Sequence, residues 1–148
     1  MSKTVVIRGD GGQVQMEVLN YERPNASEGS DANWLVCRCA VTVREFSCDV
    51  RLSLMTDDFV RFLGDLDEAQ RSLKGTAVFA TPESGLKVEI KFKSAGHADV
   101  WGAVQSQLSV VPSRTKLDFS FESDQSFLSQ TAEGLRAVIQ QFPVRSGI

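Results

Sequence analysis

Two neighbouring stretches of this chain alternate between apolar and polar side chains with the period of a β-strand. In residues 35–43 and 46–54 nearly every second residue is apolar, as expected for strands that bury one face. A two-residue turn after Val43 would pair it with Phe46 and would oppose apolar side chains along the whole inner face. Because a slip of one residue would destroy this match, the pattern predicts an antiparallel hairpin with one register.

The same register places two arginines, Arg38 and Arg51, opposite each other on the polar face of the hairpin. Opposed like charges destabilise a sheet unless an acid lies between them, and Asp49 is the diagonal neighbour of Arg38. We therefore expect Asp49 to screen both arginines, in a polar cluster that a partner can also use.

Two segments change to a period of 3.6 residues and predict helices. The first covers about residues 56–73, with Thr56 as the expected N-cap and Gly75 as the stop. The second covers about 124–142 and ends before Pro143. Outside the helices, alternating patterns predict strands at residues 5–8, 13–19, 35–43, 46–54, 76–80, 86–92, 98–110 (bent at Gly102) and 117–122.

This order of elements predicts an α+β fold. We expect a mainly antiparallel, curved β-sheet of seven or eight strands with both helices packed on it. A chain of 148 residues with 42% apolar content has the size of one domain, so residues 1–148 are taken as a single unit. The pattern leaves open whether the helices lie on one or both faces of the sheet.

Composition narrows the function. The formal net charge of −3 argues against a nucleic-acid partner, and the absence of a run of about 18 apolar residues or of a signal peptide predicts a cytoplasmic protein that does not bind membranes. All three cysteines (Cys37, Cys39 and Cys48) fall on the apolar face of the hairpin. We expect free core thiols rather than a zinc site, which normally needs four ligands at turn spacing.

The sequence offers little for catalysis or for a cofactor. His97 is the single histidine, and its position after Gly96 favours a turn or the start of a strand over an acid–base role. Residues 9–12 resemble a phosphate-binding loop in glycine content alone, since neither a Lys-Ser/Thr ending nor a helix follows them. We therefore expect a protein without enzyme activity and without a cofactor.

Acidic and aromatic side chains are the candidates for contact with a partner. The polar face of the first helix and the loop at residues 20–30 carry carboxylates, which are either an ordinary solvated surface or an acidic patch. The two tryptophans would be core residues if one helix covers each face of the sheet, and exposed anchors if both cover one face. The candidate partner-binding residues are Glu28, Asp31, Trp34, Asp49, Asp58, Asp65, Glu68 and Trp101.

The segment Asp31-Ala32-Asn33-Trp34-Leu35 resembles a signature of the WapI family of bacterial immunity proteins. Members of that family are small cytoplasmic proteins that are encoded beside polymorphic toxins and neutralise the toxin by binding it. The resemblance implies no catalytic residue, and it implies a toxin that is often a nuclease. Further segments that fit the family are residues 54–56, 96–97, 124–128, 134–135 and 142–144.

The leading hypothesis is therefore neutralisation of a cognate, basic protein toxin by stoichiometric occlusion. One alternative is a small-ligand or carbohydrate-binding β-rich module, or a residual hydrolase, with Trp34, Trp101 and His97 around a pocket. Another is a secretion-type chaperone with an exposed apolar surface. The sequence does not decide among oligomeric states.

Overall fold

The structure is a computed structural model that describes residues 2–27, 29–81, 85–106 and 115–145. These residues form eight strands and two α-helices. The elements are β1 (Lys3–Gly9), β2 (Gly12–Tyr21), β3 (Trp34–Val43), β4 (Phe46–Met55), α1 (Thr56–Ser72), β5 (Thr76–Ala80), β6 (Leu86–Phe92), β7 (His97–Gln105), β8 (Lys116–Asp124) and α2 (Gln125–Gln141).

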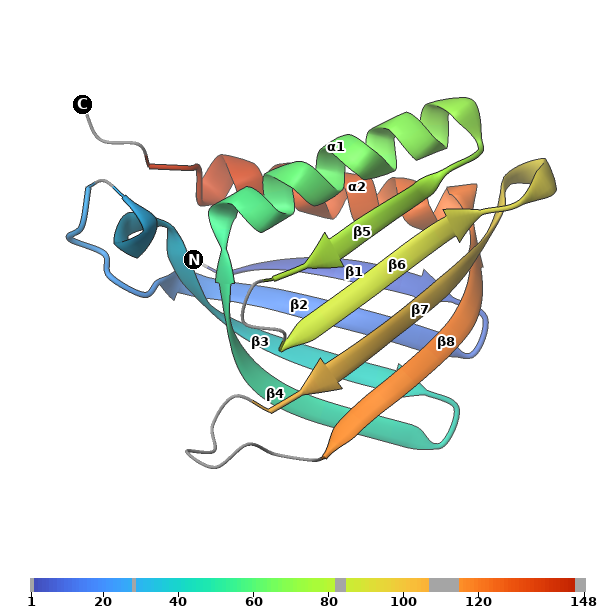
Figure 1. The fold of residues 1–148 in the computed structure, drawn as a ribbon, viewed down its shortest axis with the longest axis horizontal. Helices are drawn as coiled ribbons and strands as arrows, with labels where there is room; N and C mark the ends of the chain where they lie inside the picture. The colour runs from blue at the N-terminus through green and yellow to red at the C-terminus, as the bar shows by residue number, and fades with distance from the viewer. Residues whose placement is uncertain (1, 28, 82–84, 107–114, 146–148) are drawn as a thin grey trace.

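The strands form two antiparallel sheets of four, in the orders β1-β2-β3-β4 and β5-β6-β7-β8. The α+β class is confirmed, but the single curved sheet is wrong. The two sheets face each other, and the helices lie along one side, with α2 against β1 and α1 against β5 (Figure 1). The chain splits into two sheets because α1 intervenes between β4 and β5 and carries β5 away from the edge of β4.

The predicted hairpin register is confirmed residue by residue. Val43 pairs with Phe46, and Arg38 lies opposite Arg51. The guanidinium of Arg38 donates to both carboxylate oxygens of Asp49 at 2.8 and 2.7 Å, and these hydrogen bonds lower the pKa of Asp49. Arg51 has no ion pair within the described ranges, so Asp49 pairs with Arg38 and the predicted ion-pair screening of Arg51 is not seen.

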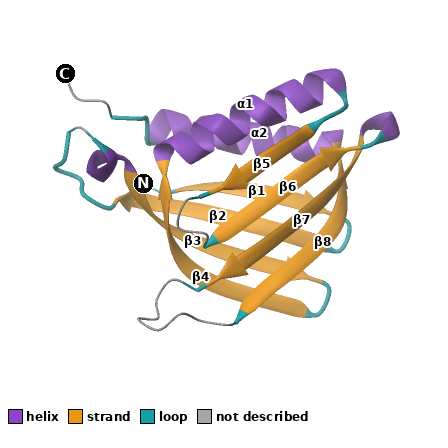
Figure 2. Ribbon diagram, viewed as in Figure 1, coloured by secondary structure: helices purple, strands orange, loops and turns teal. Residues whose placement is uncertain are grey.

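Both helices bury an apolar stripe against the sheets. Phe59 and Phe62 of α1 are fully buried and contact the ring of Phe79 on β5 edge-on, with ring centroids 5.3 and 5.5 Å apart. On α2, the hydroxyl of Thr131 donates to the carbonyl of Val6 on β1 at 2.7 Å. The helices thus join the two sheets through the edge strands β5 and β1 (Figure 2).

The predicted N-cap of the first helix is wrong. Met55 is the N-cap of α1, whereas Thr56 is already helical and its hydroxyl donates to Oδ1 of Asn33 at 2.9 Å. The cap of α2 is Asp124, whose carboxylate accepts from the backbone N–H of Phe127 at 3.0 Å. The first helix ends at Ser72, and Leu73 follows with a left-handed φ of 55°.

The cysteines are free, as predicted. Cys37 and Cys39 are fully buried between the sheets, while Cys48 on β4 is only half-buried. The strand predicted at residues 98–110 is observed as His97–Gln105, and it stays paired with both neighbouring strands through Gly102. Its segment 107–110 lies outside the described residues.

Candidate functional site

The outer face of the second sheet presents one large aromatic side chain. Trp101 lies on β7, whose alternation buries Val100 completely and leaves the tryptophan 43% exposed. Trp101 is therefore not a core residue. Gly102 follows it, and a Cβ there would lie 2.7 Å from the carbonyl oxygen of Lys87 and would overlap the ring of Phe119. Glycine at this position leaves room for the ring of Phe119, which is 7% exposed, to pack against β7.

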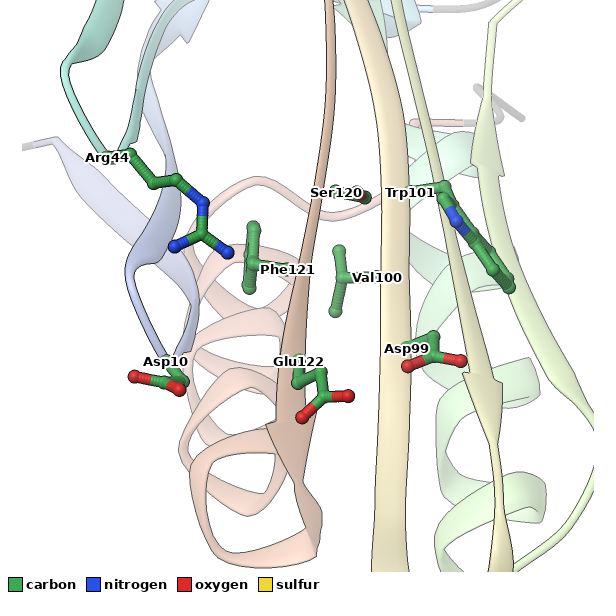
Figure 3. A pocket seen from close by; sticks show the side chains of 8 residues that line it. All are labelled: Asp10, Arg44, Asp99, Val100, Trp101, Ser120, Phe121 and Glu122. Atoms are coloured by element: carbon green, nitrogen blue, oxygen red, sulfur yellow. The ribbon is translucent and has the colours of Figure 1, made fainter.

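Trp101 forms one wall of a hollow of about 330 Å³ (Figure 3). The hollow collects side chains from four separate parts of the chain. Trp101 and Asp99 come from β7, Glu122 comes from β8, Asp10 comes from the turn between β1 and β2, and Arg44 comes from the turn between β3 and β4.

Backbone contacts between the two turns and β8 hold this hollow in shape. The N–H of Asp10 donates to the carbonyl of Glu122 at 2.7 Å, and the N–H of Arg44 donates to the carbonyl of Gly11 at 2.9 Å. A Cβ at Gly12 would overlap the ring of Phe121. The glycine-rich segment 9–12 is therefore a hairpin turn against which β8 packs, in agreement with the sequence.

Some charged side chains of the hollow form ion pairs and others do not. The ammonium of Lys93 lies 2.9 Å from Asp99 and 3.5 Å from Glu122, and its hydrogen bond to Asp99 is the main cause of a raised pKa of Lys93. Asp10 and Arg44 have no ion pair among the residues that the structure describes. The hollow thus offers one acidic and one basic group that are free to meet a partner.

A second hollow, of about 200 Å³, lies on the other side of the indole. Lys87, Glu89, Gly102 and Ala103 line it together with Trp101, and Lys87 and Glu89 form an ion pair at 3.2 Å. The indole therefore stands as a ridge between two shallow, charged depressions. This shape suits contact with a protein surface, in which an aromatic anchor is surrounded by polar groups.

One predicted contact residue is not at the surface. We expected Asp58 on the solvated face of the first helix, but its side chain is only 2% exposed. It accepts from the backbone N–H of Met55 at 3.1 Å and from the guanidinium of Arg61 at 2.6 Å. Burial raises the pKa of Asp58 despite these two donors. Asp58 caps the helix because it is its third residue, where a carboxylate can reach back to the N-cap N–H.

The other predicted contact residues do not form one surface. Asp49 lies on the outer face of the first sheet, on the opposite side of the molecule from Trp101. Asp65 and Glu68 lie on α1, and Glu68 forms an ion pair with Arg71. Exposed Asp31 and half-buried Trp34 lie before and at the start of β3, and Glu28 lies outside the described residues.

Sequence reasoning missed Asp10, Arg44, Asp99 and Glu122. They come from four elements, so no spacing along the chain brings them together. His97 and Trp34 line neither hollow beside Trp101, so these two hollows do not bring the three residues together. Within the described ranges no group of three His, Cys, Asp or Glu side chains could hold a metal ion, and no described helix is long and apolar enough to cross a membrane.

Comparison with known proteins gives one clear match. A search of curated proteins found no match. The model of the immunity protein WapI-like family matches residues 5–143, which include every strand but the first residues of β1, both helices and both hollows. The chain therefore belongs to the WapI-like family of immunity proteins.

Proposed function

We propose that this protein binds a cognate bacterial toxin in a stoichiometric complex and blocks the toxin by covering its active surface, without catalysis. Membership of an immunity protein family supports binding of a toxin. The observation that carries the proposed interface is Trp101, which stands exposed between two hollows on an outer sheet face. Exposed aromatic side chains framed by polar groups are typical binding hot spots.

The proposed toxin is basic, and a nuclease is the class that fits best. A nuclease must attract the phosphates of nucleic acid, so its cleft carries lysines and arginines. Asp10 lines the first hollow together with Glu122 and Asp99, and it has no ion pair in the described part of the chain. A cationic side chain of the toxin can bind there while the indole of Trp101 packs beside it.

A binding measurement tests the interface. The probe is the protein encoded by the reading frame next to this one, titrated calorimetrically with this chain. We expect one-to-one binding that Trp101→Ala weakens roughly 30-fold or more, because a central aromatic anchor contributes about 2 kcal/mol or more. Val60→Ala is the matched control, since Val60 is an equally exposed apolar residue (44%) on α1.

Two outcomes would contradict this proposal. No binding of the neighbouring protein, at any concentration at which both proteins are folded, would refute toxin neutralisation. Unchanged affinity of a folded Trp101→Ala variant would move the interface away from the second sheet.

Two carboxylates on α1, half-buried Asp65 and exposed Glu68, are proposed to steer association rather than to hold the complex. Reversing Asp65 and Glu68 to lysine should slow association at low salt and leave dissociation nearly unchanged, because rim charges act over distance. Asp31 and Trp34 remain candidates for the rim of the same complex, whereas Asp49 lies on the opposite side of the molecule from Trp101 and is not proposed as a contact. An association rate that does not respond to the double reversal would remove α1 from the steering surface.

A further inference from the structure

The first sheet ends in a strand whose inner face is not covered. Phe46 at the start of β4 is 65% exposed, and Cys48 and Val50 on the same face are only half-buried. Their partners on β3 are buried, because β8 packs across β1, β2 and β3. Along one half of β4, the apolar side chains that the hairpin pattern directs inward are therefore exposed at Phe46 and only partly covered by the core at Cys48 and Val50.

The backbone of the same half-strand has a free edge. β4 is the last strand of its sheet, along the lower margin of the molecule in Figure 2. A two-residue turn makes Val43 and Phe46 a hydrogen-bonded pair, so Phe46, Cys48 and Val50 bond to β3. The alternate residues Ser47 and Asp49, and Arg51 after them, direct their N–H and C=O groups outward.

Two opposite charges flank this edge. Glu45 in the turn and Arg51 on the strand are both exposed, and neither has an ion pair within the described residues. A free edge with inward apolar residues is a template for pairing with another strand. A matching partner strand has apolar residues at alternate positions, an acid at one end and a base at the other. The segment Glu45 to Arg51, which includes the first half of β4, has this pattern itself.

We propose that two copies of this chain associate through antiparallel pairing of their β4 strands, centred on Cys48. In this register Cys48 lies opposite Cys48 of the second copy, Phe46 lies opposite Val50, and Glu45 lies opposite Arg51. Because the dimer has a two-fold axis, the pair of Phe46 with Val50 and the pair of Glu45 with Arg51 each occur twice. The first sheets of both copies then continue as one sheet, and the uncovered apolar face of each β4 extends alongside the other.

Charge selects this register over its neighbours. Because outward-directed residues must pair with outward-directed residues, the register changes in steps of two. If the pairing is centred on Asp49 instead of Cys48, Asp49 lies opposite Asp49 of the second copy. If it is centred on Ser47, Glu45 lies opposite Asp49 of the second copy. Both neighbouring registers therefore oppose like charges, whereas the proposed register pairs Glu45 with Arg51 twice.

The central cysteine provides a direct probe. In the proposed dimer the two Cys48 residues form a non-hydrogen-bonded pair, with Cα atoms about 4.5 Å apart, which is within the range for a disulfide. Diamide should therefore join them, taking up the two electrons and two protons that the two thiols release. The covalent dimer should form in high yield in the wild type and be absent in Cys48→Ser.

Sedimentation velocity over a wide range of protein concentrations tests the interface itself. We expect a reversible wild-type dimer whose dissociation constant rises about tenfold in Arg51→Glu, since two attractive pairs become repulsive. The double variant Glu45→Arg, Arg51→Glu exchanges the two charges and should restore the dimer. Ser47→Pro should weaken the dimer because it removes two edge N–H donors, whereas Ser47→Ala, which keeps them, should not.

Two results would overturn the proposal. One is a wild-type chain that stays monomeric at the highest concentration. If in that case Ser47→Pro abolishes binding of the neighbouring protein, the edge of β4 binds the toxin and not a second copy. The other is a dimer that neither Arg51→Glu nor Ser47→Pro affects.

Discussion

Asn33 and Arg145 are joined by two hydrogen bonds. The backbone N–H of Arg145 donates to Oδ1 of Asn33 at 2.7 Å, and Nδ2 of Asn33 donates to the carbonyl of Arg145 at 2.9 Å. The guanidinium of Arg145 continues this junction, lying 3.6 Å from the centre of the Tyr21 ring and donating to the carbonyl of Ala32 at 2.9 Å. With Thr56 also bonded to Asn33, one buried amide connects the C-terminal segment, the loop before β3 and the start of α1.

Replacement of Asn33 should therefore cost stability. Asn33→Ala leaves the hydroxyl of Thr56 and the backbone of Arg145 without partners in a site that is 7% exposed. We expect the free energy of unfolding to fall by about 2–3 kcal/mol in urea titration. Asn25→Ala, in the exposed part of the same loop, is the control and should change it by less than about 0.5 kcal/mol. Equal effects of the two substitutions would contradict the role of Asn33.

Two glycines should respond in opposite directions to alanine. A Cβ at Gly9 would overlap the carbonyl of Glu122 and lie 2.7 Å from the ring of Phe121, so Gly9→Ala should destabilise the protein by about 2 kcal/mol or more. Gly64 in α1 has open space around it, and Gly64→Ala should raise the free energy of unfolding by about 0.5–1 kcal/mol. Thermal unfolding measures both. A stabilising Gly9→Ala would show that β8 does not pack closely on this turn.

Charge reversal should lower the unfolding free energy much more at the buried Asp58 than at the exposed Glu68 of the same helix. Asp58→Lys removes the acceptor of the Met55 N–H and places a cation at a buried helix N-terminus, so we expect a loss of about 2–4 kcal/mol. Glu68→Lys, at an exposed position of the same helix, should change the unfolding free energy by about 0.5 kcal/mol or less. Equal tolerance of both reversals would contradict the cap.

The same carboxylate predicts a pH dependence. Burial raises the pKa of Asp58 in the folded state above its value in the unfolded chain. The folded state therefore binds the proton more tightly, and this contribution to stability is present below the ordinary aspartate pKa of about 3.9 and is lost as the pH rises through the raised value. The difference in unfolding free energy between wild type and Asp58→Asn, measured across this range, should decline with rising pH. A difference that grows with pH would reverse the assignment.

The three thiols should differ in reactivity. Burial raises the pKa of Cys39 to about 12 and that of Cys37 still further, whereas Cys48 is half-buried and its pKa is raised less. Since the thiolate is the reactive form, iodoacetamide at about pH 8 and low protein concentration should modify Cys48 first. Mass spectrometry should find the other two modified only after unfolding. Early modification of Cys37 would contradict its burial between the sheets.

Local patterns along the sequence determined the elements and their pairing within one hairpin. The two-residue period and the two-residue turn were enough to pair Val43 with Phe46, and the helical stripes predicted α1 and α2 to within two residues. These features depend on neighbours within a few residues, where the backbone has few choices. The family resemblance rested on segments such as residues 31–35, and the structure gives Asn33 of that segment a buried, hydrogen-bonded position.

Only the tertiary structure decided how these pieces are placed. The division into two sheets, the exposure of Trp101 and the burial of Asp58 depend on which surfaces meet across the core. Contacts such as that between Gly12 and Phe121 join residues more than a hundred positions apart, and no short-range period encodes them. The hollow beside Trp101 and the free edge of β4 follow from this packing, because the helices pack against the edge strands β1 and β5 and do not cover the outer sheet faces or the edge of β4.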